Sequence, residues 1–475
     1  MSKIFPPSHR LRPRRTLVNL AVALVIALIL MHSGLFCAAQ DGMPIPKNAV
    51  DPQIDAAVRQ VSADHVHQTI EKLVSFGNRS TISAQEDAAI KAGKGVGAAR
   101  EWIKGELDRY SKDCGGCLEV KTDSFLEPAA DRIPKPTQIT NVYAVLRGTD
   151  PKQADRIVLV TGHYDSRNSD TFNTTDAAPG ANDDGSGTAV SLECARVLSK
   201  MKFPATIIFL TVAGEEQGLN GSNHFAEMAR QQGWKIEAVL NNDIVGGDRS
   251  PQQDAGVVRV FSEGLPNAAT EKEIQRIRAL GGESDSPSRE LARYVLEVGR
   301  TYSSSFSVHP MALFRLDRFL RGGDHYSFNQ QGFAAVRFTE FREDYNHQHQ
   351  NVRTENAVEY GDLPKFVNFD YVAAVARLNA ATLAALASGP SPPAKVKMLT
   401  KELENDTHLT WEAAAGAASY EVVWRATSSP DWEHVQMVGA TSATMKVSKD
   451  NVIFGVRAVD EAGHRSLPVV PEPER

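Results

Sequence analysis

The segment GANDDGSGTA places two acidic residues, Asp183 and Asp184, side by side between small residues. Adjacent carboxylates repel each other and gain little from packing, so the pair suggests that something is held there. Further histidine and carboxylate residues stand at several other places in the chain: His163, Asp165, Glu215, Glu216, Asp243, His347 and His349. Histidine with carboxylates and without cysteine is typical of zinc in a hydrolytic site rather than a structural one.

Three near-continuous apolar runs, at residues 156–162, 205–213 and 236–240, end in these polar residues. Helical patterns at 187–201 and 221–233 separate the runs. Apolar strands that alternate with helices predict an α/β fold, with a mostly parallel-stranded sheet flanked by helices. Ligands bind outside the carboxyl ends of such strands, so we expect the polar residues to crowd one rim of the sheet.

So many carboxylates on one rim would be destabilising without compensating cations. Two divalent metal ions would remove the repulsion, because one carboxylate can bridge two ions about 3.5–4 Å apart. A single carboxylate at a strand end is more often a helix cap or a solvated loop residue. The prediction of a metal site therefore depends on the whole set and not on any one member.

The motifs GHYDS, PGANDDGSG, AGEEQGLNGS, NNDIVG and GGDHYSF, followed by the region of His347, occur here in the order found in the co-catalytic zinc aminopeptidases. The chain resembles that family over about residues 50–388, and the same clan contains glutamate carboxypeptidase and glutaminyl cyclase. The resemblance implies a zinc-exopeptidase fold and two zinc ions per chain. His163 and Asp243 would bind one zinc, Glu216 and a late histidine the other, and Asp183 would bridge both.

The late histidine has two candidates in the sequence, His347 and His349. The family commonly shows His-x-x-x-Asp at this place, and His347 matches the histidine, but Asn351 stands where the aspartate would be. We predict His347 as the ligand from this register, with His349 as the competing choice.

The resemblance also implies roles beside the metals. Glu215 would be the general base, and Asp165 would orient His163 by accepting its second ring N–H. Asp184 would follow Asp183 through a cis peptide and shape the turn. His325 in GGDHYSF matches a histidine near the substrate, and Tyr326 would line the same cleft.

The expected activity is hydrolysis of N-terminal amino acids from peptides. A carboxypeptidase or a glutaminyl cyclase on the same scaffold is the enzymatic alternative. A catalytically silent binding protein is the alternative from another class. The formal net charge of −6 gives no sign of a nucleic-acid partner.

The first 39 residues predict a secretory signal, with arginines, an apolar core from Leu20 to Met31 and small residues before a polar stretch. Cleavage after Ala39 would give a secreted or periplasmic protein, and the rival interpretation is a retained membrane anchor. An oxidising compartment favours a structural disulfide between Cys114 and Cys117. Cys194 lies in a helical apolar pattern and is expected to be a buried free thiol.

The domain division follows from composition. We expect a catalytic domain over residues 40–387 and a Pro/Ser/Gly linker over 388–395. Short alternating strands over 396–470 predict a small β-sandwich that resembles a fibronectin type III module. Trp411, Tyr420 and Phe454 are its expected core residues. The module is expected to act as a spacer or to bind protein or polysaccharide.

Overall fold

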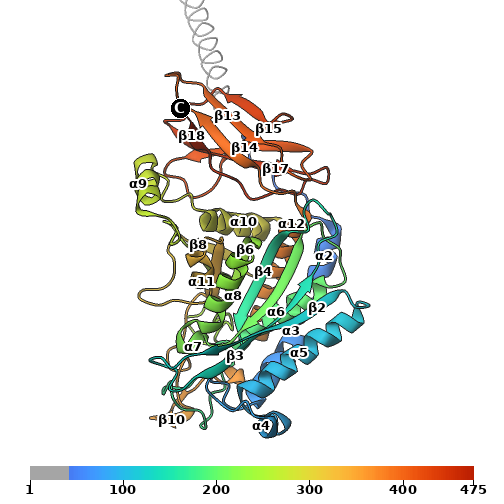
Figure 1. The fold of residues 1–475 in the computed structure, drawn as a ribbon, viewed down its shortest axis with the longest axis vertical. Helices are drawn as coiled ribbons and strands as arrows, with labels where there is room; N and C mark the ends of the chain where they lie inside the picture. Colours follow the sequence, from blue (N-terminus) through green and yellow to red (C-terminus); the bar gives the residue numbers. More distant parts are fainter. Residues whose placement is uncertain (1–41, 475) are drawn as a thin grey trace, which may run out of the picture.

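The computed structural model describes residues 42–474, so the predicted signal segment lies outside the described residues. The chain forms a large mixed sheet flanked by helices, with a β-sandwich at one end (Figure 1). The order of the large sheet is β2-β3-β5-β4-β6-β9-β7-β8. The α/β prediction is confirmed.

The eight strands run as follows: β2 Leu118–Glu127, β3 Thr137–Leu146, β4 Arg156–His163, β5 Thr206–Val212, β6 Lys235–Asn242, β7 Val257–Ser262, β8 His309–Leu313 and β9 Ala335–Glu340. The four central strands β5, β4, β6 and β9 are parallel to one another. Antiparallel pairs join β2 to β3, β3 to β5 and β9 to β7, so the sheet is mixed toward both edges. The central strands are the ones that bring the predicted site residues to one rim.

Helices cover both faces of the sheet. One face packs against α3 Ala63–Ser75, α5 Gly95–Asp113, α6 Gly185–Leu198, α10 Pro287–Thr301 and α12 Phe369–Ser388. The other packs against α8 Asn220–Gln231 and α11 His325–Gln330. Along β4, Val158 and Val160 join the first core while Ile157 and Leu159 join the second, as the alternation of side chains in a strand requires.

Shorter elements complete this part of the chain: α2 Pro52–Val58, α4 Asp87–Lys91, α7 Glu215–Gly218, α9 Glu271–Leu280, β10 Arg353–Glu355, β11 Val358–Tyr360 and η1 Pro364–Phe366. Helix α12 is long and apolar enough to cross a membrane, but 89% of its most apolar window is buried inside the protein, as expected of a core helix.

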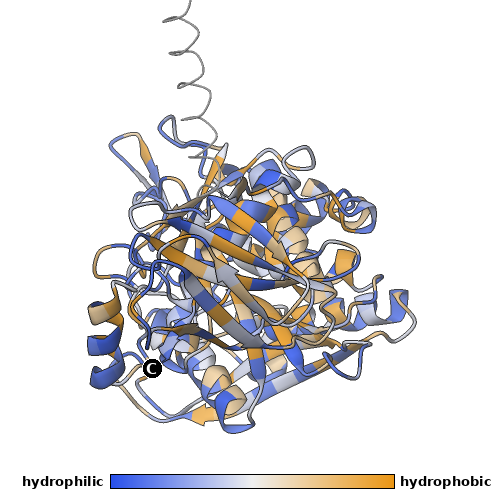
Figure 2. Ribbon diagram, turned by 90° about the horizontal axis from the view of Figure 1, so that it is seen from above, coloured by the Kyte–Doolittle hydropathy of each residue, from blue (hydrophilic) through white to orange (hydrophobic). Residues whose placement is uncertain are grey.

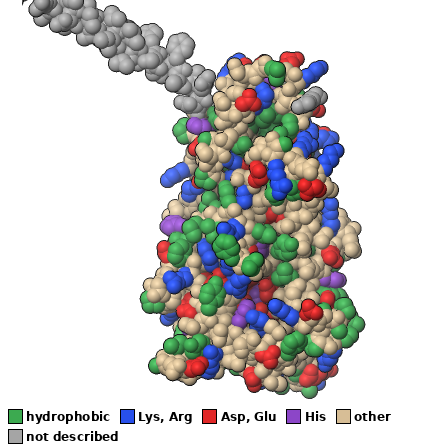
Figure 3. All heavy atoms as spheres, turned by 90° about the vertical axis from the view of Figure 1, so that its left-hand side faces the viewer, with side chains coloured by type: hydrophobic (Ala, Val, Ile, Leu, Met, Phe, Trp, Pro, Cys, Tyr) green, Lys and Arg blue, Asp and Glu red, His purple; other side chains and the backbone are tan. Residues whose placement is uncertain are grey.

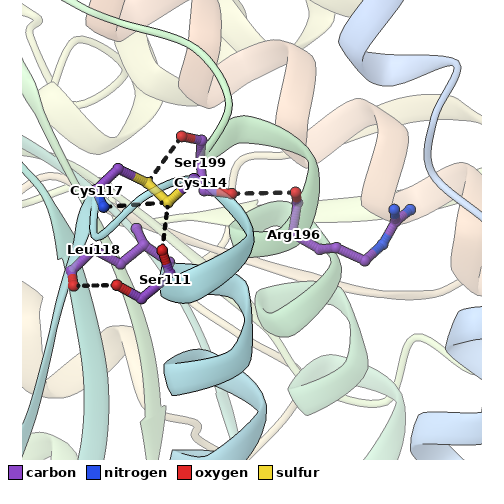
Figure 4. Close-up of a disulfide and its surroundings, with 6 residues drawn as sticks. All are labelled: Ser111, Cys114, Cys117, Leu118, Arg196 and Ser199. Atoms are coloured by element: carbon purple, nitrogen blue, oxygen red, sulfur yellow. Dashed lines mark hydrogen bonds between the residues drawn. A yellow bond between two sulfur atoms is a disulfide. The ribbon is translucent and has the colours of Figure 1, made fainter.

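The cysteines are arranged as predicted. Cys114, at the end of α5, forms a disulfide with Cys117, which leads into β2. Figure 4 shows that the disulfide lies near Ser111 of α5 and Ser199 at the end of α6. The Ser111 hydroxyl donates to the Leu118 carbonyl at 2.8 Å. Cys194 is free and buried. The disulfide therefore closes the turn between a helix and an edge strand.

Two four-stranded sheets form the sandwich, in the orders β1-β15-β14-β17 and β16-β13-β12-β18. Trp411, Tyr420 and Phe454 lie in its core, as predicted. Figure 2 looks down on this end and shows hydrophobic and hydrophilic residues mixed along the strands. The strands are β1 Met43–Pro44, β12 Ala394–Leu399, β13 Thr407–Glu412, β14 Ser419–Ala426, β15 His434–Val438, β16 Ser442–Met445, β17 Val452–Val459 and β18 Glu472–Glu474.

The sandwich differs from the predicted division at three points. Strand β1 pairs with β15, so residues 43–44 belong to the sandwich and not to the catalytic domain. Strand β12 begins inside the predicted linker, and β18 extends the sandwich beyond residue 470. Backbone pairing, which composition does not encode, sets these boundaries.

Buried ion pairs fix the sandwich against the rest of the protein. Arg457, which is 1% exposed, donates to Glu297 of α10 at 2.7 Å and to Glu421 of β14 at 2.6 Å. Arg465 contacts the same two glutamates at 3.1 and 2.9 Å. Trp432 donates its indole N–H to Glu290 of α10 at 2.9 Å. These buried contacts join the sandwich directly to α10.

Candidate metal centre

Three buried side chains meet where the central strands end. His163 closes β4, Asp243 follows β6, and Asp183 lies in the loop before α6. The Nε2 atom of His163 lies 3.2 Å from Oδ1 of Asp183 and 4.0 Å from Oδ1 of Asp243. One ligand atom from each residue lies within 4.8 Å of the other two, so these residues could hold one metal ion.

A second group shares Asp183 with the first. Nε2 of His349 lies 2.8 Å from Oδ2 of Asp183 and 3.1 Å from Oε1 of Glu216, at the start of α7. The two oxygens of Asp183 therefore face two different histidines. This is the geometry in which one carboxylate could bridge two cations.

Unpartnered polar atoms show that the residues fit cations. Among the described residues, Nε2 of His163 and Oε1 of Glu216 are buried and have no hydrogen-bond partner. Buried polar atoms are almost always paired, because an unpaired one loses its hydration without compensation. A cation in each group would satisfy these atoms and remove the repulsion among the carboxylates.

Two aspartates hold the ligands in place. Oδ1 of Asp165 lies 3.4 Å from Nδ1 of His163, and its Oδ2 accepts from the hydroxyl of Thr81 at 2.7 Å. Asp184 follows a cis peptide and accepts the backbone N–H of His163 at 2.9 Å and that of Gly187 at 2.8 Å. The ring of His163 hydrogen-bonds to the main-chain oxygen of Asp165 at 3.2 Å, and Oδ1 of Asp165 has no hydrogen-bond partner among the described residues, so the orienting role of the Asp165 carboxylate stays a prediction. Asp184 lies in the turn, where its contacts with two backbone N–H groups hold the chain.

The glycine at position 187 is required by close packing. A Cβ atom there would lie 2.1 Å from the carbonyl oxygen of Asn242 and 2.5 Å from Oδ2 of Asp184. The start of α6 can therefore approach the end of β6 only without a side chain at this point. This approach brings the loop that carries Asp183 next to Asp243.

Glu215 lies beside both groups without belonging to either. Its Oε2 lies 4.0 Å from Nε2 of His163, and its side chain is 15% exposed. Burial raises the pKa of Glu215 well above its usual range. The charge of His163 opposes this shift, and the carboxylates of Asp243 and Glu216 add to it. A carboxylate with a raised pKa beside a metal site is suited to accept and return a proton near neutral pH.

The prediction of His347 as a ligand has to be corrected. His347 lies with Asp248 and Asp344, outside the group of Asp183 and Glu216, and donates from Nδ1 to Asp248 at 2.6 Å. Its ring stacks on Phe366 with centroids 3.6 Å apart. The loop after β9 turns so that the residue two places later, His349, with a φ of 56°, reaches the site.

The histidine of the GGDHYSF motif is also placed differently from the expectation. His325 is fully buried and donates from Nε2 to the carbonyl of Leu316 at 2.9 Å, so it does not line a cleft. The neighbouring Asp324 was missed. Asp324 is fully buried, and burial raises its pKa to about 7, while His163 opposes the shift and Asp243 adds to it. The acidic residue of the GGDHYSF motif was the sequence signal for Asp324.

Two arginines were also missed. Arg337 on β9 is fully buried and binds Oδ1 of Asp243 at 2.8 Å. Arg167 lies 3.3 Å from Oε2 of Glu216 and 2.8 Å from Nδ1 of His349. A single arginine inside an apolar run was the only sequence signal for Arg337.

The protonation of His349 is set by these neighbours. Burial lowers the pKa of His349, but Glu216 and Asp183 outweigh this effect and raise the pKa to about 10. Nδ1 of the same ring lies 2.8 Å from Nη2 of Arg167, and Nε2 faces the two carboxylates.

One face of the protein is hollowed. Figure 3 shows Asp and Glu side chains within a hollow in the lower half of that face, bordered by His, Lys and Arg. Hydrophobic side chains gather above the hollow. Helix α7, which carries Glu215 and Glu216, lies away from the sandwich in Figure 1.

Comparison with known proteins agrees with this geometry. Peptidase family M28 matches residues 141–366, the part of the chain that contains both groups. A probable zinc metalloprotease of Leptosphaeria maculans is 44% identical over 91% of this chain and 100% of its own. The chain belongs to peptidase family M28. A second relative, a probable zinc metalloprotease of Pyricularia oryzae, is 44% identical, and the match covers 93% of this chain and 90% of the relative.

Solved structures of similar shape include the LapA aminopeptidase of Legionella pneumophila, which is 20% identical in sequence. The match covers 73% of this chain and 78% of that chain, and its TM-score is 0.49. A glutaminyl cyclase of Fimbriiglobus ruber is 18% identical, and the match covers 68% of this chain and 95% of that chain with a TM-score of 0.47. The sequence relatives and the M28 match make this chain a zinc metallopeptidase, a hydrolase of peptide bonds.

Proposed function

We propose that this M28 peptidase is an exported aminopeptidase that uses two zinc ions and Glu215 as general base. The observation that carries the proposal is Asp183, whose two oxygens lie 3.2 Å from Nε2 of His163 and 2.8 Å from Nε2 of His349. One zinc would be held by His163, Asp183 and Asp243, the other by Asp183, Glu216 and His349.

The chain's own residues have separable roles in this reaction. Zinc at such a site supplies Lewis acidity for the attacking water and the scissile carbonyl. Glu215 accepts the proton of the water and returns it to the leaving amine. Asp165 holds the ring of His163, and Arg337 holds Asp243, so neither ligand has to reorient during turnover.

The choice of an aminopeptidase is supported by the motif set and by two complete groups of ligand residues. Relatives that cyclise glutamine usually work with one zinc, so two complete groups favour hydrolysis. The test compares amino-acid p-nitroanilides, N-blocked peptides with a free C-terminus, and peptides with N-terminal glutamine. Release of nitroaniline from free amino-acid substrates alone supports the proposal. Cleavage of N-blocked peptides would indicate a carboxypeptidase, and pyroglutamate formation a cyclase.

Export is supported by the sequence of residues 1–39 and by the Cys114–Cys117 disulfide, since disulfides persist in oxidising compartments. The measurement is N-terminal sequencing of protein recovered from outside the cytoplasm of an expressing cell. A chain that begins at residue 40 supports removal of the signal. A chain that begins at residue 1 and fractionates with membranes contradicts it.

The sandwich is proposed to be a fibronectin type III-like module, which its two packed four-stranded sheets support. Its buried contacts with α10 support a role in holding the catalytic part rather than in spacing it from a surface.

A further inference from the structure

The loop between β8 and α11 carries two large apolar side chains in open solvent. The relative exposure of Phe319 is 81% and that of Leu320 is 105%. These two residues occupy the middle of a turn that the backbone N–H of Arg321 closes on the carbonyl of Arg318 at 3.3 Å. Leu320 has a φ of 55°, which at this position of a turn favours glycine or asparagine. An apolar residue held exposed in an unfavourable backbone conformation points to a role in binding rather than in stability.

Two arginines fix the turn from the inside. Nη1 of Arg318 lies 2.6 Å and Nη1 of Arg321 lies 2.8 Å from Oε2 of Glu343, whose side chain is 2% exposed. Because both ends of the turn are tied to one buried carboxylate, the exposed pair between them is held in place. The guanidinium of Arg315 lies over the Phe319 ring, 3.9 Å from its centroid. The apolar side chains are therefore presented without further ordering, which lowers the cost of binding a partner.

The turn lies beside the candidate metal centre. Nη1 of Arg321 also donates to Oε1 of Gln348 at 3.3 Å, and Nε2 of Gln348 donates to Oδ2 of Asp183 at 3.0 Å. The turn is thus two contacts away from the carboxylate that the two groups share. Closer to α11, a Cβ atom on Gly323 would lie 3.0 Å from Oδ2 of Asp243. Three residues of chain span at most about 11 Å, so the tip of the turn lies within that distance of this glycine.

Two other loops expose aromatic rings as well. Tyr345 is 63% exposed, and its ring centroid lies 6.0 Å from the guanidinium of Arg321. Phe172 is 50% exposed and follows Thr171, whose carbonyl accepts from Nε2 of Gln217 in α7 at 3.2 Å. Both loops lead to a candidate metal ligand, so apolar residues are exposed on three of the segments that build the site.

The position of the tip selects a part of the substrate. An aminopeptidase cleaves after the first residue, so every other residue of a peptide lies downstream of the scissile bond. Phe319 and Leu320 are too exposed to line an enclosed pocket for that first residue. An extended peptide advances about 3.3–3.6 Å per residue, so about three downstream residues cover the distance between the metal groups and the tip.

We propose that Phe319 and Leu320 bind apolar side chains at the third and fourth positions of the peptide substrate. The preferred substrates are then peptides with an apolar segment behind the N-terminal residues. The contacts that join the turn to Asp183 favour this occupant over a lipid surface or a second copy of the chain. This inference rests on the proposed aminopeptidase function and adds the part of the substrate on which selection acts. Both residues determine specificity and take no part in bond breaking.

The test uses the zinc-loaded full chain and substrates that share their first residue: leucine p-nitroanilide, Leu-Gly-Gly-Gly and Leu-Gly-Phe-Leu. Both peptides break the same Leu–Gly bond, so the chemical step is matched and only the third and fourth residues differ. Initial rates of leucine release give kcat/KM for each peptide. The wild type should prefer Leu-Gly-Phe-Leu by at least about tenfold, which the burial of one large apolar side chain is sufficient to supply.

The double variant Phe319→Ser/Leu320→Ser should reduce this preference to less than about twofold, through a higher KM for Leu-Gly-Phe-Leu. The readout is the ratio of kcat/KM for the two peptides in one preparation, which a smaller amount of folded enzyme does not change. Leu403 is the matched control, because it is 99% exposed in the loop between β12 and β13 of the sandwich. Leu403→Ser should keep the wild-type preference.

A wild type that cleaves both peptides equally well overturns the inference, as does a double variant that keeps the preference. In both cases hydrolysis of leucine p-nitroanilide preserves the proposed function. No leucine release from any of these substrates would contradict both proposals. Two further measurements cover the other occupants of the tip. Sedimentation with phosphatidylcholine vesicles, or formation of a dimer, by the wild type and not by the double variant would overturn the inference if the peptide preference is also absent.

Discussion

His347 donates a 2.6 Å hydrogen bond to Asp248, and this contact keeps its imidazole outside the group formed by Asp183, Glu216 and His349. The ring of Phe366 stacks on the imidazole of His347 with centroids 3.6 Å apart. His347 therefore fixes the segment between β9 and β10 from which His349 reaches the site. Two histidines only two residues apart have separate roles, one as an anchor and one as a candidate ligand.

Replacing these two histidines separately should give different metal contents. His349→Ala should lower the zinc content of the purified protein from two ions to one per chain, because it removes a ligand of the second group alone. His347→Ala should retain two ions, since its ring contacts no member of either group. Metal analysis by mass spectrometry after gel filtration measures both. Loss of an ion in His347→Ala and not in His349→Ala would restore the assignment made from the sequence register.

Glu215→Gln should keep its zinc and lose about 10²–10⁴-fold in kcat, the range expected when a general base is removed. The amide preserves the shape of the side chain but cannot accept a proton. Glu216→Gln is the control from the next position in the chain, because Glu216 lies 3.1 Å from His349 in the second group and its loss should reduce bound metal. Turnover by Glu215→Gln within tenfold of the wild type would rule out the role of Glu215.

The sandwich should stabilise the whole chain through Arg457. Arg457→Ala leaves Glu297 and Glu421 with Arg465 as their remaining arginine in a buried interface, so the cost should lie near the lower end of the range for a broken buried pair, about 3 kcal/mol. Arg300→Ala removes a pair with Asp431 of similar type, but its members are 58% and 40% exposed, so the cost should stay below about 1 kcal/mol. Thermal unfolding followed by tryptophan fluorescence compares them. Equal losses in the two variants would show that the sandwich contributes little.

His464 should make the stability of this junction depend on pH. Its ring lies between Asp460 and Asp51, each 2.9 Å away, and the hydrogen bond to Asp460 raises its pKa above the usual 6.5 while burial opposes the shift. The folded state therefore binds the proton more tightly than the unfolded state. This stabilisation is fully present below pH 6.5 and is lost as the pH rises through the folded pKa.

His464→Gln should accordingly cost up to about 1 kcal/mol at pH 6 and much less at pH 9. Denaturant unfolding at both pH values, with the wild type measured alongside, gives the difference. A cost that grows with pH would show that the neutral ring stabilises the junction. Asp51 remains available in the variant to cap α2 through its contact with the backbone N–H of Gln53 at 2.7 Å.

The sequence was sufficient to predict the residues that end regular strands. His163 and Asp243 follow β4 and β6, so the geometry of a parallel sheet brings them to one rim without further information. His349 lies in an irregular loop, where register cannot be counted from a neighbouring strand and a residue with positive φ redirects the chain. The candidate ligands at strand ends were predictable for this reason, and His349 in its irregular loop was not.

The edges of both sheets were also beyond prediction. The pairing of β1 with β15 joins residues nearly four hundred positions apart, and nothing in the local pattern of Met43 and Pro44 indicates a partner.

The arginines at the site were missed for a related reason. Arg337 and Arg167 gain their meaning from the carboxylates and the imidazole that they meet in space, and an isolated cation in a sequence carries no such information.

The pairing of Met43 with Val435 seats the first described residues of the chain on the β-sandwich, at the end of the molecule away from α7 (Figure 1). A fluorophore, affinity handle or bead fused ahead of residue 42 is consequently attached at the end of the molecule away from Glu215 and Glu216. An enzyme immobilised in this way would present its open face to the surrounding solution.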